Sequence, residues 1–141
     1  MITNEDVKFI RFSSFCDDRG SLIPIESQKS IPFDIERIFY VYGINGQEIR
    51  GKHSHYKTQQ VLICLKGSCI VICKDGKSTK EYMLDSPEIG LFIPEMIWDE
   101  QIYRSPDTIL LVLSSTKYDK SDYIEDWSLF LEEKEKEESK K

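Results

Sequence analysis

Short apolar segments recur along most of this chain, and polar, turn-forming residues separate them. Six of these segments are rich in β-branched and aromatic residues, which favours strands at 35–43, 59–65, 68–74, 80–84, 90–94 and 108–115. Two earlier strands are predicted at 8–14 and 20–26, on either side of a loop at 15–19. A strand about every 8–12 residues, with no long helical pattern between strands, predicts an all-β barrel or sandwich.

The end of the chain has a different pattern. Ile124, Trp127, Phe130 and Leu131 recur at helical spacing, and Ser121 is a suitable N-cap for a short C-terminal helix. Beyond Leu131 only Glu, Lys and Ser remain, so we expect a charged, solvated tail over 132–141. A length of 141 residues is typical of a single domain, and we place that domain at 1–131.

Composition and charge narrow the class of protein. The net charge is −6, which does not favour non-specific binding to nucleic acid or to acidic membranes, so an anionic ligand needs a local cluster of cations. No CxxC pair occurs among the four cysteines, which are expected to be reduced and buried. There is neither a signal-peptide pattern nor an apolar run of membrane-spanning length, and we expect a cytoplasmic protein.

Both histidines of the chain lie in one short segment, at His53 and His55. In an extended chain, residues two apart point to the same side, and a buried imidazole pair is costly unless it binds something or is hydrogen-bonded. Gln60 and Gly67 complete the spacing HxH-x4-[E/Q]-x6-G. This is the layout of the first cupin motif, with Gln in the place where metal cupins usually carry Glu.

The second cupin motif is matched only in part, by PEMIWD at 94–99. Pro94 fits it, whereas Met96 and Asp99 stand where a Gly and a His are usual. The chain therefore resembles a cupin over most of residues 35–115, which implies a barrel or jelly roll of antiparallel strands with two metal ligands altered.

This alteration leaves three kinds of function open. His53, His55 and Asp99 form a two-His-one-carboxylate set of the kind that suits iron, for a metal-dependent oxygenase or isomerase. Alternatively, imidazole acts as an acid and base without a metal, on a proton next to a ketone. A sugar-binding cupin without catalysis is the third. Because neutral Gln60 removes an anionic ligand, we favour the second.

Five segments in order resemble the dTDP-4-keto-6-deoxyglucose 3,4-ketoisomerases, small cupins that supply 3-amino-3,6-dideoxyhexose biosynthesis. They are IPFDIERIFYVYG, RGKHSH, QQVLICLKGS, LDSPEIGLFIPEMIW and YDKSDYI. The similarity spans about residues 18–124. It implies a dTDP-linked 4-keto-6-deoxyhexose as substrate, no metal and no other cofactor, a homodimer, and no nucleic-acid or membrane partner.

The resemblance also implies roles for the histidine segment. His53 matches the first His of the family's RGxHxH motif, and would take the C-3 proton to give an enediolate that is reprotonated at C-4. His55 would shuttle protons or hold the hydroxyl and carbonyl oxygens. Gln60 is a candidate for a hydrogen bond to substrate.

The diphosphate of such a substrate needs cations, and the planar guanidinium group suits it. Arg50 matches the family motif, but strict alternation would place it on the opposite face from His53. A bulge at Gly51 would turn both residues inward. Arg37 is the second candidate, since a charged residue in an apolar strand needs a partner.

Four further residues are candidates for substrate binding. Tyr40 and Trp98 are suited to stacking on thymine. In the family, the gluco or galacto configuration of the product has been tied to two positions, which are Arg19 and Asp99 in this chain. Arg19 resembles the galacto-forming members and Asp99 matches neither type, so we favour the galacto product slightly.

Overall fold

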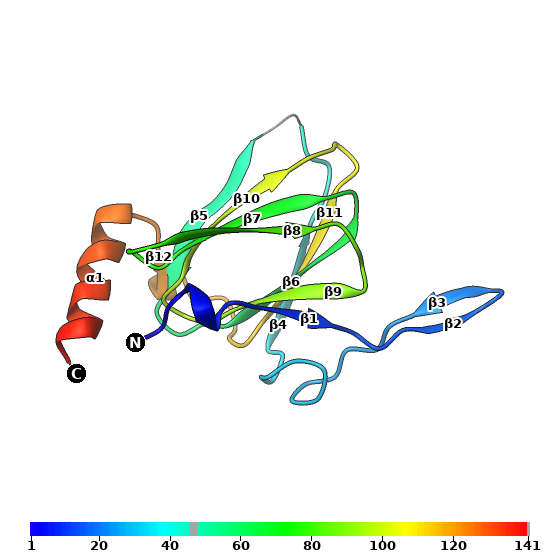
Figure 1. Ribbon diagram of the computed structural model, residues 1–141, viewed down its shortest axis with the longest axis horizontal. Coiled ribbons are helices and arrows are strands. Elements are labelled where there is room, and N and C mark those ends of the chain that lie inside the picture. The colour runs from blue at the N-terminus through cyan, green and yellow to red at the C-terminus, as the bar shows by residue number, and fades with distance from the viewer. Residues whose placement is uncertain (46–47, 141) are drawn as a thin grey trace.

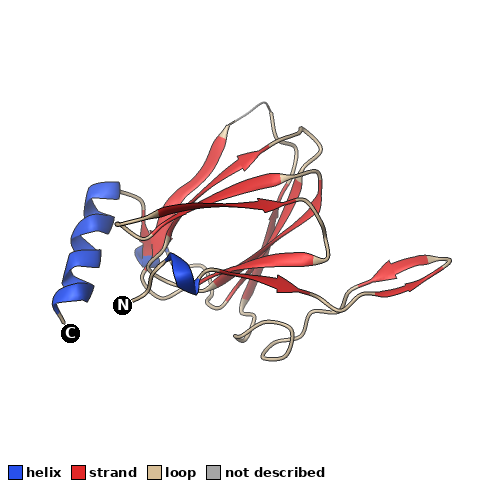
Figure 2. Cartoon of the chain, in the orientation of Figure 1, coloured by secondary structure: helices blue, strands red, loops and turns tan. Residues whose placement is uncertain are grey.

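In the computed structural model, which describes residues 1–45 and 48–140, antiparallel strands form two sheets that face each other (Figure 1 and Figure 2). The first half of the chain contains, in order, η1 (Asn4–Asp6), β1 (Lys8–Arg11), β2 (Phe15–Asp17), β3 (Gly20–Leu22), β4 (Arg37–Val41), β5 (Ile49–His55) and β6 (Gln60–Lys66). The second half contains β7 (Cys69–Lys74), β8 (Thr79–Leu84), β9 (Ile89–Ile93), β10 (Trp98–Tyr103), β11 (Ile109–Ser114), η2 (Lys120–Asp122), β12 (Tyr123–Ile124) and α1 (Trp127–Ser139).

The strand order explains how distant segments meet. One five-stranded sheet has the order β1-β9-β6-β11-β4, and the other has the order β12-β5-β10-β7-β8. β2 and β3 form a separate hairpin that projects away from both sheets (Figure 1). The prediction of an all-β cupin-type barrel of antiparallel strands with a C-terminal helix is confirmed. Among the described residues, four strands lie outside the predicted segments: β2, which falls within the predicted loop at 15–19, and β5, β10 and β12.

The main core lies between the two sheets, where alternate residues of each strand meet. In β7, for example, Cys69, Val71 and Cys73 are buried and the residues between them are partly exposed. Burial of apolar surface stabilises the folded state by about 25 cal/mol per Å². The apolar residues that alternate along each strand therefore hold the two sheets together. Among the cysteines, which are all free, those in β6 and β7 are buried as predicted, whereas Cys16 in β2 is exposed.

A second apolar layer covers the outer face of the first sheet. Phe12, Ile31 and Phe33 pack there on Val61 and Ile63 of β6. The chain between β3 and β4 supplies much of this cover, and β6 is consequently buried on both faces over its first five residues. This arrangement leaves the interior face of β6 to serve the site.

The C-terminal helix differs from its prediction at both ends. Asp126 is its N-cap and accepts a hydrogen bond from the Leu129 N–H (3.0 Å), so the assignment of Ser121 was wrong. Residues 123–124 pair with β5 as β12, and this extended backbone cannot continue a helix back to Ser121. The helix extends to Ser139, so the prediction of a solvated tail beyond Leu131 was also wrong within the described residues; Lys141 lies outside them.

The helix is fixed to the barrel by a buried lysine. The Nζ atom of Lys134 donates to the carbonyl oxygens of Ile2 (2.7 Å) and Met96 (3.1 Å). Phe130 packs on Trp98 beneath the helix. Among residues 1–45 and 48–140, no helix has the length and apolar content that would be required to cross a membrane.

Candidate active site

A β-bulge in β5 sets the orientation of the histidine segment. His53 is paired with Asp99 of β10, but the next pair is Gly51 with Glu100, so the register shifts between them. Gly51 (φ +82°) and Lys52 (φ +57°) have left-handed backbones. A Cβ atom on Gly51 would lie 3.1 Å from the carbonyl oxygen of Asp99, which explains why glycine stands there. The predicted bulge is confirmed.

The bulge brings Arg50 to the same side as the histidines. Its guanidinium group interacts with the hydroxyl of Tyr103, which is fully buried in the core between the sheets. Burial raises the pKa of Tyr103, and the nearby Arg50 acts in the opposite direction. Arg50 itself remains exposed at the edge of the barrel.

His53 and His55 lie side by side on one face of β5. Their ring centroids are 5.0 Å apart, and both rings contact Tyr123, at 5.2 Å from His53 and 4.5 Å from His55. Tyr123 reaches them because β12 pairs with β5, with Tyr123 opposite His55. Three rings from two strands therefore form one cluster.

His55 is buried and chemically unsatisfied. It is 4% exposed, and its Nε2 atom has no hydrogen-bond partner among the described residues. Burial lowers the pKa of His55 to about 3, and the positive charges of His53 and Arg37 contribute to the same shift. His55 is thus a neutral imidazole at physiological pH, with one nitrogen available to a ligand.

Arg37 joins the cluster from the opposite sheet. Its Nη1 donates to the Tyr123 hydroxyl (3.3 Å), which bridges β4 and β12. Its guanidinium carbon lies 5.5 Å above the ring centroid of Phe39 and 5.7 Å above that of Tyr118. The buried Nε has no partner among residues 1–45 and 48–140, so this arginine retains a donor for a ligand.

Gln60 lies in the same cross-strand row as Arg37. Ser114 of β11 is paired with both residues, and its hydroxyl accepts a hydrogen bond from the Gln60 Nε2 (3.1 Å). Gln60 is 4% exposed and points to the same face of β6 as Leu62, which lies in the core between the sheets. The row thus presents a guanidinium, a hydroxyl and an amide on the inner face of the first sheet.

Asp99 lies beside His53 inside the barrel. It is 2% exposed, and its Oδ1 accepts a hydrogen bond from the Gln101 Nε2 (3.1 Å). Burial raises the pKa of Asp99, while the charge of His53 and the Gln101 hydrogen bond lower it in part. Strand pairing thus places the carboxyl group of Asp99 opposite His53.

Three predicted binding residues are not at this site within one chain. Arg19 lies at the tip of the β2–β3 hairpin, exposed and paired with Asp17 (2.6 Å). Tyr40 is 64% exposed, because it alternates with Phe39 and Val41, which face the core. Trp98 lies on the opposite face of β10 from Asp99, where it packs against the helix.

The metal-site alternative finds no support in the positions of the donors. Within residues 1–45 and 48–140, no three His, Cys, Asp or Glu side chains form a group that could hold a metal ion. His53, His55 and Asp99 are neighbours, but they do not converge on one point. The same segment carries neutral Gln60 where an anionic ligand would stand.

Two pairs of residues at the site were not predicted. Tyr118 and Tyr123 belong to the segment YDKSDYI, and two tyrosines in so polar a stretch were the available signal. Gln101 and Tyr103 follow Asp99 at a spacing of two, which signals a shared face once β10 is recognised as a strand. Both omissions followed from leaving the segments outside the predicted sheet.

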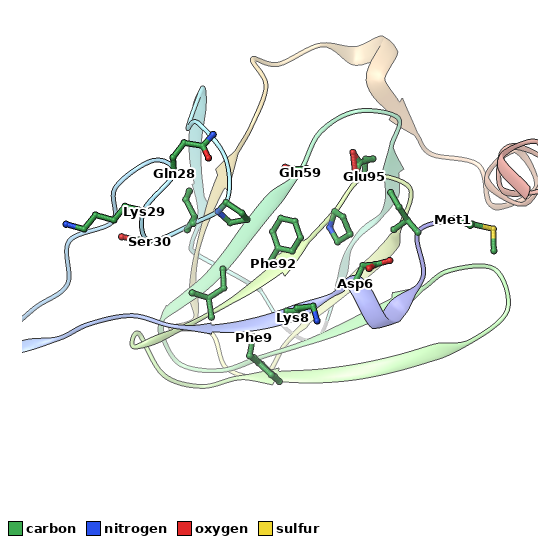
Figure 3. Close-up of a pocket in the computed structure, with 15 residues that line it drawn as sticks. Met1, Asp6, Lys8, Phe9, Gln28, Lys29, Ser30, Gln59, Phe92 and Glu95 are labelled. Atoms are coloured by element: carbon green, nitrogen blue, oxygen red, sulfur yellow. The ribbon is translucent and has the colours of Figure 1, made fainter. Parts of the chain in front are cut away.

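A separate hollow lies away from the histidines. It has a volume of about 930 Å³ and is lined by the N-terminal segment, the chain at 28–32 and the end of β9 (Figure 3). Gln59 and Phe92 face it, whereas Gln60 points into the barrel. The hollow contains neither histidine and is not part of the candidate active site.

The fold and the site together define a small cupin-type barrel with an imidazole pair in its interior. The chain matches the family described as "FdtA: WxcM-like, C-terminal" over residues 5–135, and it belongs to that family. It is 46% identical over 123 residues to the TDP-4-oxo-6-deoxy-alpha-D-glucose-3,4-oxoisomerase of Aneurinibacillus thermoaerophilus, an alignment that covers 87% of this chain and 88% of the relative.

Two solved structures are similar over nearly the whole chain. One is QdtA, a sugar 3,4-ketoisomerase from Thermoanaerobacterium thermosaccharolyticum in complex with TDP, with a TM-score of 0.90 and 39% identity, covering 94% of this chain and 96% of QdtA. The other is a 3,4-ketoisomerase from Helicobacter canadensis, with a TM-score of 0.90 and 42% identity, covering 92% of this chain and 98% of that protein.

Proposed function

We propose that this protein is a sugar 3,4-ketoisomerase that converts dTDP-4-keto-6-deoxy-D-glucose to a dTDP-3-keto-6-deoxyhexose, for 3-amino-3,6-dideoxyhexose biosynthesis in the cytoplasm. The observation that carries the proposal is the histidine pair, in which a half-buried imidazole lies beside a buried neutral one with an unpartnered nitrogen. Family membership and the oxoisomerase relative at 46% identity support the reaction type.

His53 acts as the base at C-3 in this proposal. The C-3–H bond breaks as its proton moves to the imidazole, and the electron pair forms a C-3=C-4 double bond. The C-4 carbonyl oxygen thereby becomes the oxygen of an enediolate. Delivery of the proton to C-4, with loss of the proton on O-3, leaves a carbonyl at C-3. Atoms and electrons balance without an external oxidant.

His55 moves the proton between the two oxygens. A neutral imidazole carries one N–H donor and one nitrogen acceptor, so it can accept a proton from O-3 while donating one to O-4. Because burial lowers the pKa of His55 to about 3, the ring keeps this dual character across the physiological range. Its unpartnered Nε2 supports this role.

Arg37 and Arg50 are the proposed contacts for the diphosphate. Arg37 has an unpartnered Nε at the histidine cluster, and Arg50 is exposed at the barrel edge close to Tyr103. Tyr118 and Tyr123 offer ring faces for the nucleotide base in place of Trp98, which the helix covers. QdtA was solved with TDP bound, which supports a thymidine nucleotide as the ligand of this chain.

A homodimer and a galacto product complete the proposal. The β2–β3 hairpin projects from the barrel with exposed Phe15 and Leu22, an apolar surface that a second copy would cover (Figure 1). Arg19 lies on this hairpin, far from Asp99 of its own chain. The two positions associated with product configuration therefore meet only if Arg19 of the partner subunit enters the barrel.

Incubation with dTDP-4-keto-6-deoxyglucose in D₂O, followed by proton NMR, tests the proposal. We expect loss of the original C-3 proton signal, a 3-keto product, and a galacto configuration at C-4. His53→Asn should reduce turnover by at least about 100-fold, since a lost general base costs that much. A protein that binds the nucleotide sugar but leaves its C-3 proton in place would be a sugar-binding cupin, and the proposal would fail.

A further inference from the structure

Asp99 occupies an unusual position for a carboxylate. It is the cross-strand partner of His53 and also of Cys73, so it lies in the middle of the second sheet on the interior face. Only 2% of its surface is exposed. A buried carboxylate with no cation bound to it is costly, and such residues are retained where the charge has a use.

Neutral groups hold this carboxyl group in place. The Tyr103 hydroxyl donates to the Gln101 Oε1 (2.6 Å), and the Gln101 Nε2 donates to the Asp99 Oδ1 (3.1 Å). Gly51 of β5 leaves room for this carboxyl group, because a Cβ atom at Gly51 would lie only 3.2 Å from the Asp99 Oδ1.

Within one chain, the charged and titratable groups around Asp99 come from three strands. β5 contributes His53 and Arg50, β10 contributes Glu100 and Tyr103, and β7 contributes Cys69 and Cys73. Arg50 lies beside Tyr103. Burial raises the pKa of Asp99 and of both thiols, which keeps the thiols neutral. Glu100 repels the charge, whereas a positive His53 favours it, so the ionised form of Asp99 is supported most when His53 is protonated.

We propose that Asp99 is a positioning residue for His53, whose carboxylate balances the positive charge that the imidazole acquires when it removes the C-3 proton. This role rests on the proposed function. No hydrogen bond joins the two groups in the described structure, so the coupling acts through space in an interior of low dielectric constant. Asp99 accepts no substrate atom in this scheme and acts through His53 alone.

The variant Asp99→Asn tests the role with little change of shape. An asparagine can keep the hydrogen bond from Gln101 but carries no charge. Glu100→Gln is the matched control, because Glu100 is the adjacent carboxylate on the other face, bonded to Lys74 and Trp98. The chain has only two histidines, so the C-2 proton signals of both rings can be assigned and titrated by NMR.

We expect the His53 signal to titrate at a pH about one unit lower in Asp99→Asn than in the wild type, because a neighbouring anion favours the imidazolium form. The acidic limb of the kcat/KM profile should move to lower pH by the same amount. At neutral pH kcat should fall about 10-fold or more, with KM changed less than about twofold. Glu100→Gln should leave the His53 titration unchanged.

An unchanged His53 titration in Asp99→Asn would overturn the inference, even if activity is lost, because the residue would then act on substrate or on folding. A rise in KM at constant kcat would overturn it as well. If the His53 titration moves as expected but the wild-type protein does not isomerise the ketosugar, the electrostatic pair exists and the proposed function is what has failed.

Discussion

Burial of His55 makes the stability of the barrel depend on pH. The unfolded chain protonates this imidazole near its ordinary pKa of 6.5, whereas the folded chain holds the pKa at about 3. Between these values the unfolded state binds more protons, so stability is fully present above about pH 6.5 and is lost as the pH falls toward 3. The loss due to His55 should approach about 1.4 kcal/mol per pH unit within that window.

Urea unfolding at pH values between about 4 and 7 measures this dependence. The free energy of unfolding of His55→Asn should fall less steeply with decreasing pH than that of the wild type. His53→Asn is the matched control, because its ring is only half-buried. Equal slopes for His55→Asn and the wild type would show that His55 is protonated in the folded barrel.

Single residues of the site were predictable where spacing alone decides their face. His53 and His55 share a face because they are two apart, and Gly51 was expected to carry the bulge that turns Arg50 inward. Trp98 could not be placed, because its face depends on whether the helix or the opposite sheet covers it. A single residue of register decides between these two environments.

At the scale of elements, the attachment of α1 depends on Lys134. Its ammonium group satisfies the buried carbonyl oxygen of Met96 and the partly buried one of Ile2, and pairs with Glu137 (3.1 Å). Lys134→Met keeps the apolar stem but leaves both carbonyls without their donor, which should destabilise the fold by about 2–3 kcal/mol. Thermal or urea unfolding would measure the loss.

Lys136→Met is the control for this prediction, since Lys136 makes an exposed pair with Glu133 and should change stability by less than about 1 kcal/mol. Equal effects of the two variants would show that the buried contacts of Lys134 do not hold the helix. The sequence could not reveal them, because a lysine among glutamates has the composition of a solvated tail. Its burial follows from the tertiary position of Ile2 and Met96.

The prediction of strands was likewise limited where tertiary position, not local composition, decides which residues are buried. Strands with continuous or alternating apolar residues, such as β6 and β11, were located to within one or two residues. β10 was missed because its interior positions are Asp99, Gln101 and Tyr103, which read as a polar loop. These polar residues face the interior at the candidate site. The alternation of apolar and polar residues that identifies a strand is therefore absent where a strand contributes to such a site.

At the scale of the whole molecule, antiparallel pairing and the two facing sheets could be predicted, but the place of the hairpin could not. β2 and β3 contact each other and leave large apolar side chains exposed, with Phe15 at 64% and Leu22 at 62%. Ile38, Tyr40 and Tyr42 form a second exposed apolar row along β4. No local pattern in one chain tells which of these surfaces the proposed second copy would cover.

The proposed dimer predicts that Phe15→Ser with Leu22→Ser yields a monomer by analytical ultracentrifugation, while Leu129→Ser on the exposed side of α1 remains dimeric. A wild-type monomer, or a double variant that stays dimeric, would contradict this use of the hairpin.

Mixing two inactive proteins tests whether Arg19 serves the partner's barrel. We expect Arg19→Ala and His53→Asn each to lose activity as homodimers. If Arg19 enters the barrel of the partner subunit, each mixed dimer contains one site with both groups intact and one site with neither. Random reassociation of equal amounts should then restore about a quarter of the wild-type sites, because half of the dimers are mixed. If Arg19 acts in its own barrel, every site carries one defect, and the mixture must stay inactive.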